Sequence, residues 1–290
     1  MKKFTAVLLG AILLVSITAC GKEKEAGNAI APATNASVNE AAPASAEGAL
    51  PTVDDLITKS AEASKELKSF SMQADIDQKM TIKQGDQVMN QDVYIAMTMD
   101  VQQDPIAIYQ ELTMDMGDAG KTDIKQYITK DGIYSQADGT WVKLPDEMID
   151  TMVAEMEAAA NPEAQLEQFK SIANDAKVTE EGNEYILSAD LSGDGLKEMA
   201  KNLMGQAASG NEEQVAAMME MMDIKSIKIS NAVNKETYLP TRTDVHLEMD
   251  MEVEGQSVSL IMIMKTEFSK HNELEDIKVP QDVIDSAIEA

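Results

Sequence analysis

Apolar and polar residues alternate along much of this chain, with the period of two that is typical of β-strands buried on one face. The longest alternating runs cover residues 70–82, 93–101, 106–116, 245–253 and 258–268. Shorter runs lie around Tyr127, Tyr134 and Val178, and in residues 185–191 and 224–229. Turn-forming residues separate several runs, as in Gln84-Gly85-Asp86, Lys130-Asp131-Gly132, Ala137-Asp138-Gly139 and Glu254-Gly255-Gln256. The pattern therefore predicts a large antiparallel sheet built from hairpins.

Methionine marks the apolar side of four of these predicted strands. Each strand carries a Met-x-Met pair, namely Met97/Met99, Met114/Met116, Met249/Met251 and Met262/Met264. Residues two apart in a strand project to the same face, so each pair places two thioethers side by side. His246 falls on the opposite face from Met249 and Met251. We therefore expect one Met-lined sheet surface.

Helical periodicity replaces the alternation in the middle of the chain. Four amphipathic stripes are formed by Met148, Ile149, Met152, Val153 and Met156; by Leu166, Phe169 and Ile172; by Leu196, Met199, Leu203 and Met204; and by Val215, Met218, Met219 and Met222. A further helix is predicted from Thr52, whose hydroxyl can accept from the backbone amide of Asp55 while Asp55 reaches back, to about Lys68. A short helix is expected from Asp282.

Amphipathic helices and half-buried strands must cover each other's apolar faces. The predicted fold class is α+β, a strongly curved antiparallel sheet, or half-open β-barrel, with helices packed on its concave apolar face. A cavity between the two layers would be lined by the eight methionines of the strand pairs and by Met152, Met156, Met218 and Met222. One predicted strand is apolar on both sides in its middle, because Ile261 and Ile263 interrupt its polar face, so we expect its outer side to be covered there.

The charge balance limits the classes of partner. The chain has 51 acidic residues against 24 Lys and Arg, so repulsion disfavours nucleic acid and anionic membrane surfaces. Aromatic residues make up 4% of the chain, whereas there are 21 methionines, so flexible side chains supply much of the apolar bulk. We expect a monomer with an adaptable apolar interior and no nucleic-acid partner.

The N-terminal residues predict export. Lys2 and Lys3 precede an apolar run, residues 4–17, that is short for a membrane span, and Ala19 precedes the single cysteine, Cys20. Residues 1–19 are therefore interpreted as a signal peptide. Residues 20–50 are rich in Ala with scattered Pro and Gly, as in a flexible tether, and residues 51–290 form the folded domain. A single cysteine excludes an intramolecular disulfide.

The last four residues of this leader, Ile17-Thr18-Ala19-Cys20, resemble the bacterial lipobox. The resemblance implies cleavage before Cys20 and diacylglycerol on its sulfur, which anchors the protein to the outer face of the cell membrane.

The layout of residues 52–290 resembles the LolA/LppX-like lipoproteins, in particular their uncharacterised Gram-positive members. The resemblance is carried by the leading helix into Leu67-Lys68-Ser69-Phe70-Ser71-Met72, by the hairpins through Ile133-Tyr134 to Gly139-Thr140-Trp141-Val142-Lys143-Leu144-Pro145, and by Ile277-Lys278-Val279-Pro280. It implies a half-open β-barrel closed by helices, with a hydrophobic cavity that carries lipids or acyl chains.

Three roles for the methionines follow from the residues alone. They can line a pliable lipid cavity, fill an ordinary core, or bind Cu(I) through their thioethers. A soft-metal site needs ligands that converge on one point, whereas these methionines extend along strands and His246 faces away from them. A filled core would leave the acidic surface to act as an adaptor for a cell-envelope partner. We predict the lipid-binding role, with no metal and no cofactor.

The calcium-loop pattern in the chain is incomplete. Asp190-x-Ser192-x-Asp194-Gly195 matches the first half of an EF-hand loop, but its twelfth position is Lys201 in place of the bidentate Glu. Ser192 or Asp194 can instead cap the helix predicted to follow.

Catalytic patterns are also missing, because no Gly-x-Ser-x-Gly elbow occurs beside a histidine. Carboxylate pairs alternate with apolar residues as solvated charges do. The groups considered were His246, His271, Glu248/Asp250 and Asp115/Asp118. We therefore assign no catalytic residue and expect a binding protein that is not an enzyme.

Overall fold

The computed structural model describes residues 50–145, 147–149, 175–192, 222–253 and 255–289. Their strands form one 12-stranded sheet in the order β12-β6-β5-β4-β3-β2-β1-β11-β10-β9-β8-β7. The strands are β1 (Ser69–Gln84), β2 (Gln87–Gln103), β3 (Ile106–Asp115), β4 (Lys121–Thr129), β5 (Gly132–Ala137), β6 (Thr140–Lys143), β7 (Ala176–Glu181), β8 (Glu184–Leu191), β9 (Met222–Asn234), β10 (Pro240–Val253), β11 (Gln256–Ser269) and β12 (Ile288–Glu289).

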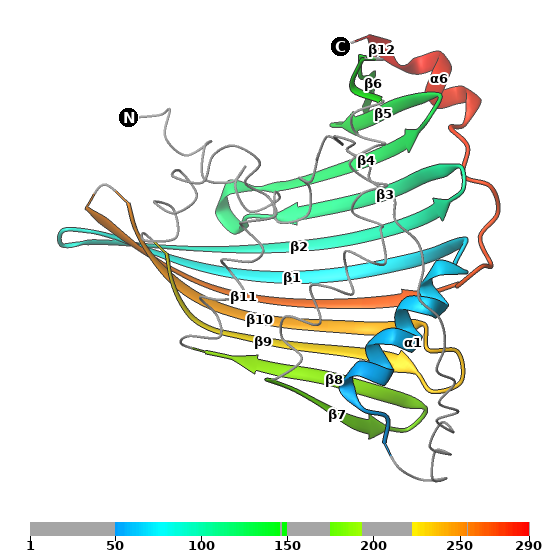
Figure 1. Ribbon diagram of the computed structural model, residues 1–290. Coiled ribbons are helices and arrows are strands. Elements are labelled where there is room, and N and C mark those ends of the chain that lie inside the picture. Colours follow the sequence, from blue (N-terminus) through cyan, green and yellow to red (C-terminus); the bar gives the residue numbers. More distant parts are fainter. Residues whose placement is uncertain (1–49, 146, 150–174, 193–221, 254, 290) are drawn as a thin grey trace, which may run out of the picture.

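Neighbouring strands are antiparallel except β12, which pairs in parallel with β6. The sheet does not close, because β12 and β7 lie at opposite edges, and it curves strongly (Figure 1). The half-open, curved antiparallel sheet predicted from the alternation is confirmed. Strand β1 pairs with β2 on one side and with β11 on the other. The second pairing brings together residues near the two ends of the folded region.

Helix α1 (Val53–Lys65) begins as the sequence predicts. The backbone amide of Asp55 donates to Thr52 Oγ1 at 3.1 Å, and the Thr52 hydroxyl donates to the Asp55 carboxylate at 2.7 Å. The capping interaction is thus confirmed, except that Asp55 bonds the hydroxyl of the cap residue. The helix ends three residues before the predicted end, and β1 starts at Ser69. Other helical elements in the described part of the chain include η1 (Gly117–Ala119), residues 147–149 and the predicted short helix, α6 (Gln281–Ser286).

The register of the strands divides the sheet into two faces, because residues paired across neighbouring strands point the same way. We call the apolar face the one that carries Ile76 and the residues in register with it. Ile76 pairs with Ile95 on β2 and with Met264 on β11, and Met264 pairs in turn with Val245 on β10. The opposite, polar face carries Asp75 and Asp77 of the same strand.

Helix α1 crosses the apolar face near the β7 edge (Figure 1). Leu56 is 2% exposed and Ile57 is 6% exposed, and both belong to a buried cluster with Leu187 and Val233 of β8 and β9. Burying such side chains stabilises the fold by about 1.5–3 kcal/mol each. This cluster closes one end of the apolar face.

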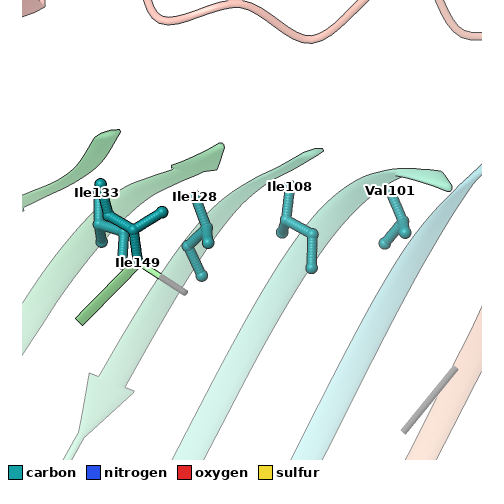
Figure 2. Packing of buried hydrophobic residues seen from close by; sticks show 5 residues of the cluster. All are labelled: Val101, Ile108, Ile128, Ile133 and Ile149. Atoms are coloured by element: carbon teal, nitrogen blue, oxygen red, sulfur yellow. The ribbon is translucent and has the colours of Figure 1, made fainter. Parts of the chain in front are cut away.

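A second buried cluster lies toward the other edge. Val101, Ile108 and Ile128 lie side by side on β2, β3 and β4, and Ile133 of β5 and Ile149 lie together at the end of this row, next to Ile128 (Figure 2). Ile133 is completely buried. Ile149 is the one member of the first predicted helical stripe whose side chain covers this face among the described residues.

Met222 corrects the prediction made for the fourth helical stripe. It begins β9 and pairs with Met251, so it lies in a strand and not in a helix. The register between β9 and β10 shifts between Ile224 and Ser226, which breaks the alternation there. Apolar residues in this segment therefore fit both the two-residue repeat of a strand and the repeat of three to four residues of a helix. Of the first predicted helix, the structure describes residues 147–149, which are helical. The second and third predicted helices lie outside the described residues, as do Met152, Met156 and Met218.

No helix among the described residues is long and apolar enough to cross a membrane.

Candidate functional site

The Met-x-Met pairs lie together on the apolar face. Met264 and Met114 belong to one row of the sheet, with Ile76 and Ile95 between them. The neighbouring rows hold Met97, Met99, Met249, Met251 and Met262, as well as Met72 and Met80, which are not part of a Met-x-Met pair. Met116 is the exception, because β3 ends at Asp115 and Met116 precedes the turn of η1.

These methionines differ from the two buried clusters in their exposure. The seven pair members within the strands, and Met116, are all half-buried. In contrast, small or branched neighbours such as Ala74 (2%), Leu260 (3%) and Val93 (6%) are buried between them. The thioether ends therefore stand above a closed layer of smaller side chains. Between the α1 cluster and the Ile133 cluster, the apolar face presents flexible, polarisable groups.

The apolar face carries no charged side chain over the ten strands that run across the sheet from β6 to β8. Each registered position on this face holds an apolar residue or an uncharged polar one. In a chain with 75 charged residues, such exclusion over a surface of this extent indicates that the face contacts apolar material. At the β7 edge, Glu180 is in register with Tyr185 and is exposed.

The polar residues on the apolar face are uncharged, with amide or hydroxyl side chains. Gln78 is 7% exposed, and its Nε2 lies 4.0 Å from the Met262 sulfur. Gln110 of β3 is in register with Met99, and its Nε2 donates to Oε1 of Gln126 on β4 at 2.7 Å. These amides offer hydrogen bonds without a net charge. They were missed in the sequence, although the signal was visible as Gln at positions where the alternation calls for an apolar residue.

The polar face carries the charges and several ion pairs. Lys228 Nζ lies 3.8 Å from Asp190, and Arg242 lies 3.5 Å from Glu184. These groups are exposed enough that each pair contributes little to stability. The Asp190 carboxylate of the calcium-like segment is therefore paired with a lysine, and no cluster of potential metal ligands occurs among the described residues. The rest of that segment lies outside the described part of the chain.

An aromatic cluster also lies on the polar face, on β3, β4 and β6. The rings of Tyr109 and Tyr127 stack with centroids 4.5 Å apart, and Trp141 follows at 5.7 Å from Tyr127. The Tyr109 hydroxyl donates to Glu111, and this bond, together with Lys125 Nζ at 3.0 Å, lowers the pKa of Glu111. Burial raises the pKa of the Tyr109 hydroxyl. The ring faces contact each other, so the cluster is a packing unit.

The two histidines lie on different segments, His246 within β10 and His271 just after β11. His246 is on the polar face, in register with Ile263 and Lys228, and its Nε2 lies 3.5 Å from Glu248. It faces away from Met249 and Met251, as predicted. His271 follows β11, where burial lowers its pKa. Glu248 and Asp250 are each more than 40% exposed on the same face.

A groove of about 710 Å³ crosses the polar face from β7 to β11. Its lining includes His246, Ser188, Ser230 and Ile263. Four acidic and four basic side chains also line it, namely Asp175, Asp190, Asp244 and Glu267, and Lys177, Lys228, Arg242 and Lys265. The groove is therefore close to neutral, in contrast to the chain as a whole.

Comparison with known proteins gives a family and a group of solved structures. A model of a family of unknown function (DUF6612) matches residues 52–288. No curated protein matches the chain in sequence. Similar solved structures include LprF from Mycobacterium bovis, with 9% identity and a TM-score of 0.43, over 79% of this chain and 96% of that one.

Two further structures are a DUF1329 family protein from Desulfovibrio piger and a LolA superfamily protein from Nitrosomonas europaea. The first has 11% identity and a TM-score of 0.22, over 79% of this chain and 94% of that one. The second has 9% identity and a TM-score of 0.19, over 81% and 97%. The LolA/LppX-like group that the sequence resembles is thus represented among the similar structures.

Proposed function

The chain belongs to the DUF6612 family, and we propose that this member is an extracytoplasmic lipoprotein that binds an uncharged hydrophobic ligand, a lipid or its acyl chains, against the apolar face of its sheet. The observation that carries the proposal is the exclusion of charge from this face together with the half-buried state of its methionines. No reaction is proposed.

The apolar face supplies the binding energy. Each methylene group moved from water onto such a surface contributes about 0.8 kcal/mol. About ten methylenes of one acyl chain would therefore contribute about 8 kcal/mol before the cost of ordering the chain is subtracted. Methionine side chains have three rotatable bonds, so the same surface fits chains that differ in length or branching.

The neutral amides set the chemistry of the ligand's polar part. A carboxylate or phosphate held against this face would lose hydration, and the described strands offer it no Lys or Arg in return. Ester carbonyls and hydroxyls, in contrast, can pair with Gln78, Gln110 and Gln126. We therefore propose an uncharged amphiphile, such as a diacylglycerol, as the preferred ligand.

Uptake of a fluorescent diacylglycerol by the purified chain tests this proposal. Met262→Glu places a carboxylate on the apolar face and is expected to abolish uptake. Ile263→Glu is the matched control, because the next residue of the same strand points to the polar face and is 38% exposed. This control is expected to keep uptake near the wild-type level. Equal loss in both variants, or no uptake by the wild type, contradicts the proposal, and the latter result favours the adaptor role.

The anchor belongs to the same proposal. Cys20 lies outside the described residues, and its lipidation is proposed from the lipobox-like sequence alone. Cys20→Ser is expected to release the protein to the medium or to leave it unprocessed. A Cys20→Ser protein that is still cleaved and still sediments with membranes would rule out this anchor.

A further inference from the structure

The isoleucines that make β11 apolar on both sides remain exposed on the polar face. Ile261 is 42% exposed and Ile263 is 38% exposed, although they occupy the middle of a strand in the centre of the sheet. Tyr94 of β2, in the same row as Ile263, is 40% exposed. We call these three side chains the outer apolar patch. Because they point away from the apolar face, ligand binding there does not account for them.

Acidic side chains surround the outer apolar patch. Asp77 lies between Ile263 and Tyr94 in the same row, and Glu248 is in register with Ile261. The acidic residues of the adjoining positions are Asp75, Asp92, Asp244 and Asp250. The lysines in register around the patch are Lys79 and Lys265, and the imidazole of His246 lies beside Ile263, so acidic groups predominate. Lys225 and Lys228 lie farther out and are bridged to Asp250 and Asp190.

The groove of the polar face adjoins this patch at Ile263. On that side, Lys228 and Arg242 are paired with acidic neighbours, so the groove carries little net charge. The negative charge is concentrated on the β1 and β2 side, at Asp75, Asp77 and Asp92. A partner that fits both parts needs apolar side chains for the isoleucines and basic side chains for the acidic positions.

We propose that the outer apolar patch docks a basic amphipathic polypeptide segment of a partner protein. Ile261 and Ile263 are about 7 Å apart along the strand. Apolar residues four apart on a helix have a similar spacing, about 6 Å, so a basic amphipathic helix fits the patch. Apolar contact at Ile261 and Ile263 supplies affinity, and the acidic surround selects basic partners and speeds their association.

The test uses two synthetic fluorescent peptides of Lys and Leu with the same composition. One has Leu at helical spacing, and the other has a scrambled order without an apolar face. Binding to the full-length chain is followed by fluorescence anisotropy at several salt concentrations. We expect the amphipathic peptide to bind at least about tenfold more tightly than the scrambled one, and its affinity to fall with salt.

Two double variants separate the apolar and electrostatic contributions. Ile261→Thr with Ile263→Thr keeps the charges and the strand preference, and it is expected to reduce binding of the amphipathic peptide to the level of the scrambled peptide. Asp77→Asn with Glu248→Gln keeps the isoleucines and is expected to weaken binding severalfold and to flatten its salt dependence. Circular dichroism and the thermal midpoint establish that each variant is folded.

The matched control is the tip of the β1–β2 hairpin, where Val88 and Met89 are 57% and 63% exposed. Val88→Thr with Met89→Thr removes a similar apolar area at a different place and should leave the affinity unchanged. Unchanged affinity in the folded Ile261→Thr/Ile263→Thr variant overturns the proposal, as does equal affinity for the two peptides, which would indicate charge attraction alone. Diacylglycerol uptake should be unaffected by the isoleucine variants, so the result does not depend on the proposed function.

Discussion

The proposed binding surface predicts that methionines on the apolar face contribute much less to stability than residues of the sealed clusters. Ile133 is completely buried and packs against Ile128 and Ile149, so Ile133→Ala leaves a cavity. Such substitutions cost about 2–5 kcal/mol, and we expect about 4 kcal/mol here. Met97 lies on the same face but is half-buried. Met97→Ala removes side-chain atoms that are already partly in water, and we expect a cost of about 1 kcal/mol.

Urea denaturation of the lipid-free protein measures both values. With a slope of about 2–3 kcal/mol per M, Ile133→Ala should lower the midpoint by roughly 1.3–2 M and Met97→Ala by about 0.3–0.5 M. Met264→Ala, on the other side of β1, provides an independent copy of the second measurement. If the methionine variants lose as much stability as Ile133→Ala, the methionines are filled core, and the reasoning that places a ligand over them is refuted.

Three further predictions concern the frame that holds the face. Thr52→Ala removes the cap of α1 and should cost about 1 kcal/mol, which calorimetry would record as a midpoint lower by roughly 2–4 °C; an unchanged midpoint would show that the cap does not hold the helix. Because the hydrogen bond from Tyr109 lowers the pKa of Glu111, the stability that Glu111 contributes is present above its unfolded pKa and is lost as the pH falls through its folded pKa. Tyr109→Phe should raise the pKa of Glu111 in an NMR titration, and an unaltered pKa would assign the shift to other groups. A Cβ at Gly132 would lie 2.6 Å from the buried Tyr134 ring, so Gly132→Ala should lower the urea midpoint, whereas a neutral effect would mean that the ring can move aside.

Alternation along the chain was sufficient to predict the strands and their faces. The Met-x-Met positions within strands fall on one face, and His246 falls on the other, because both follow from the two-residue repeat and do not depend on which strands pair. The turn at Asp138-Gly139 was also visible, since both residues adopt positive φ, which their types favour.

Other features were not accessible from the sequence. The pairing of β1 with β11 joins segments about 190 residues apart, and no local pattern specifies it. The position of α1 over β8 and β9 depends on that sheet order. Met222 was misassigned because the bulge before Ser226 disturbs the strand period where a helical period continues. The amides of the apolar face were overlooked because each Gln interrupts the apolar side of a strand when the sequence is considered alone. Only the register of the strands shows that these side chains share one surface.

We propose that the apolar face holds an uncharged lipid. This proposal can be tested by native and denaturing mass spectrometry of the full-length chain, purified without detergent exchange and compared with its Met262→Glu variant. The wild type is expected to carry a stoichiometric, non-covalent mass that extraction identifies as an uncharged lipid, and the variant is expected to lack it. A wild-type protein with no lipid mass, or one that carries the same lipid in both forms, would contradict the claim.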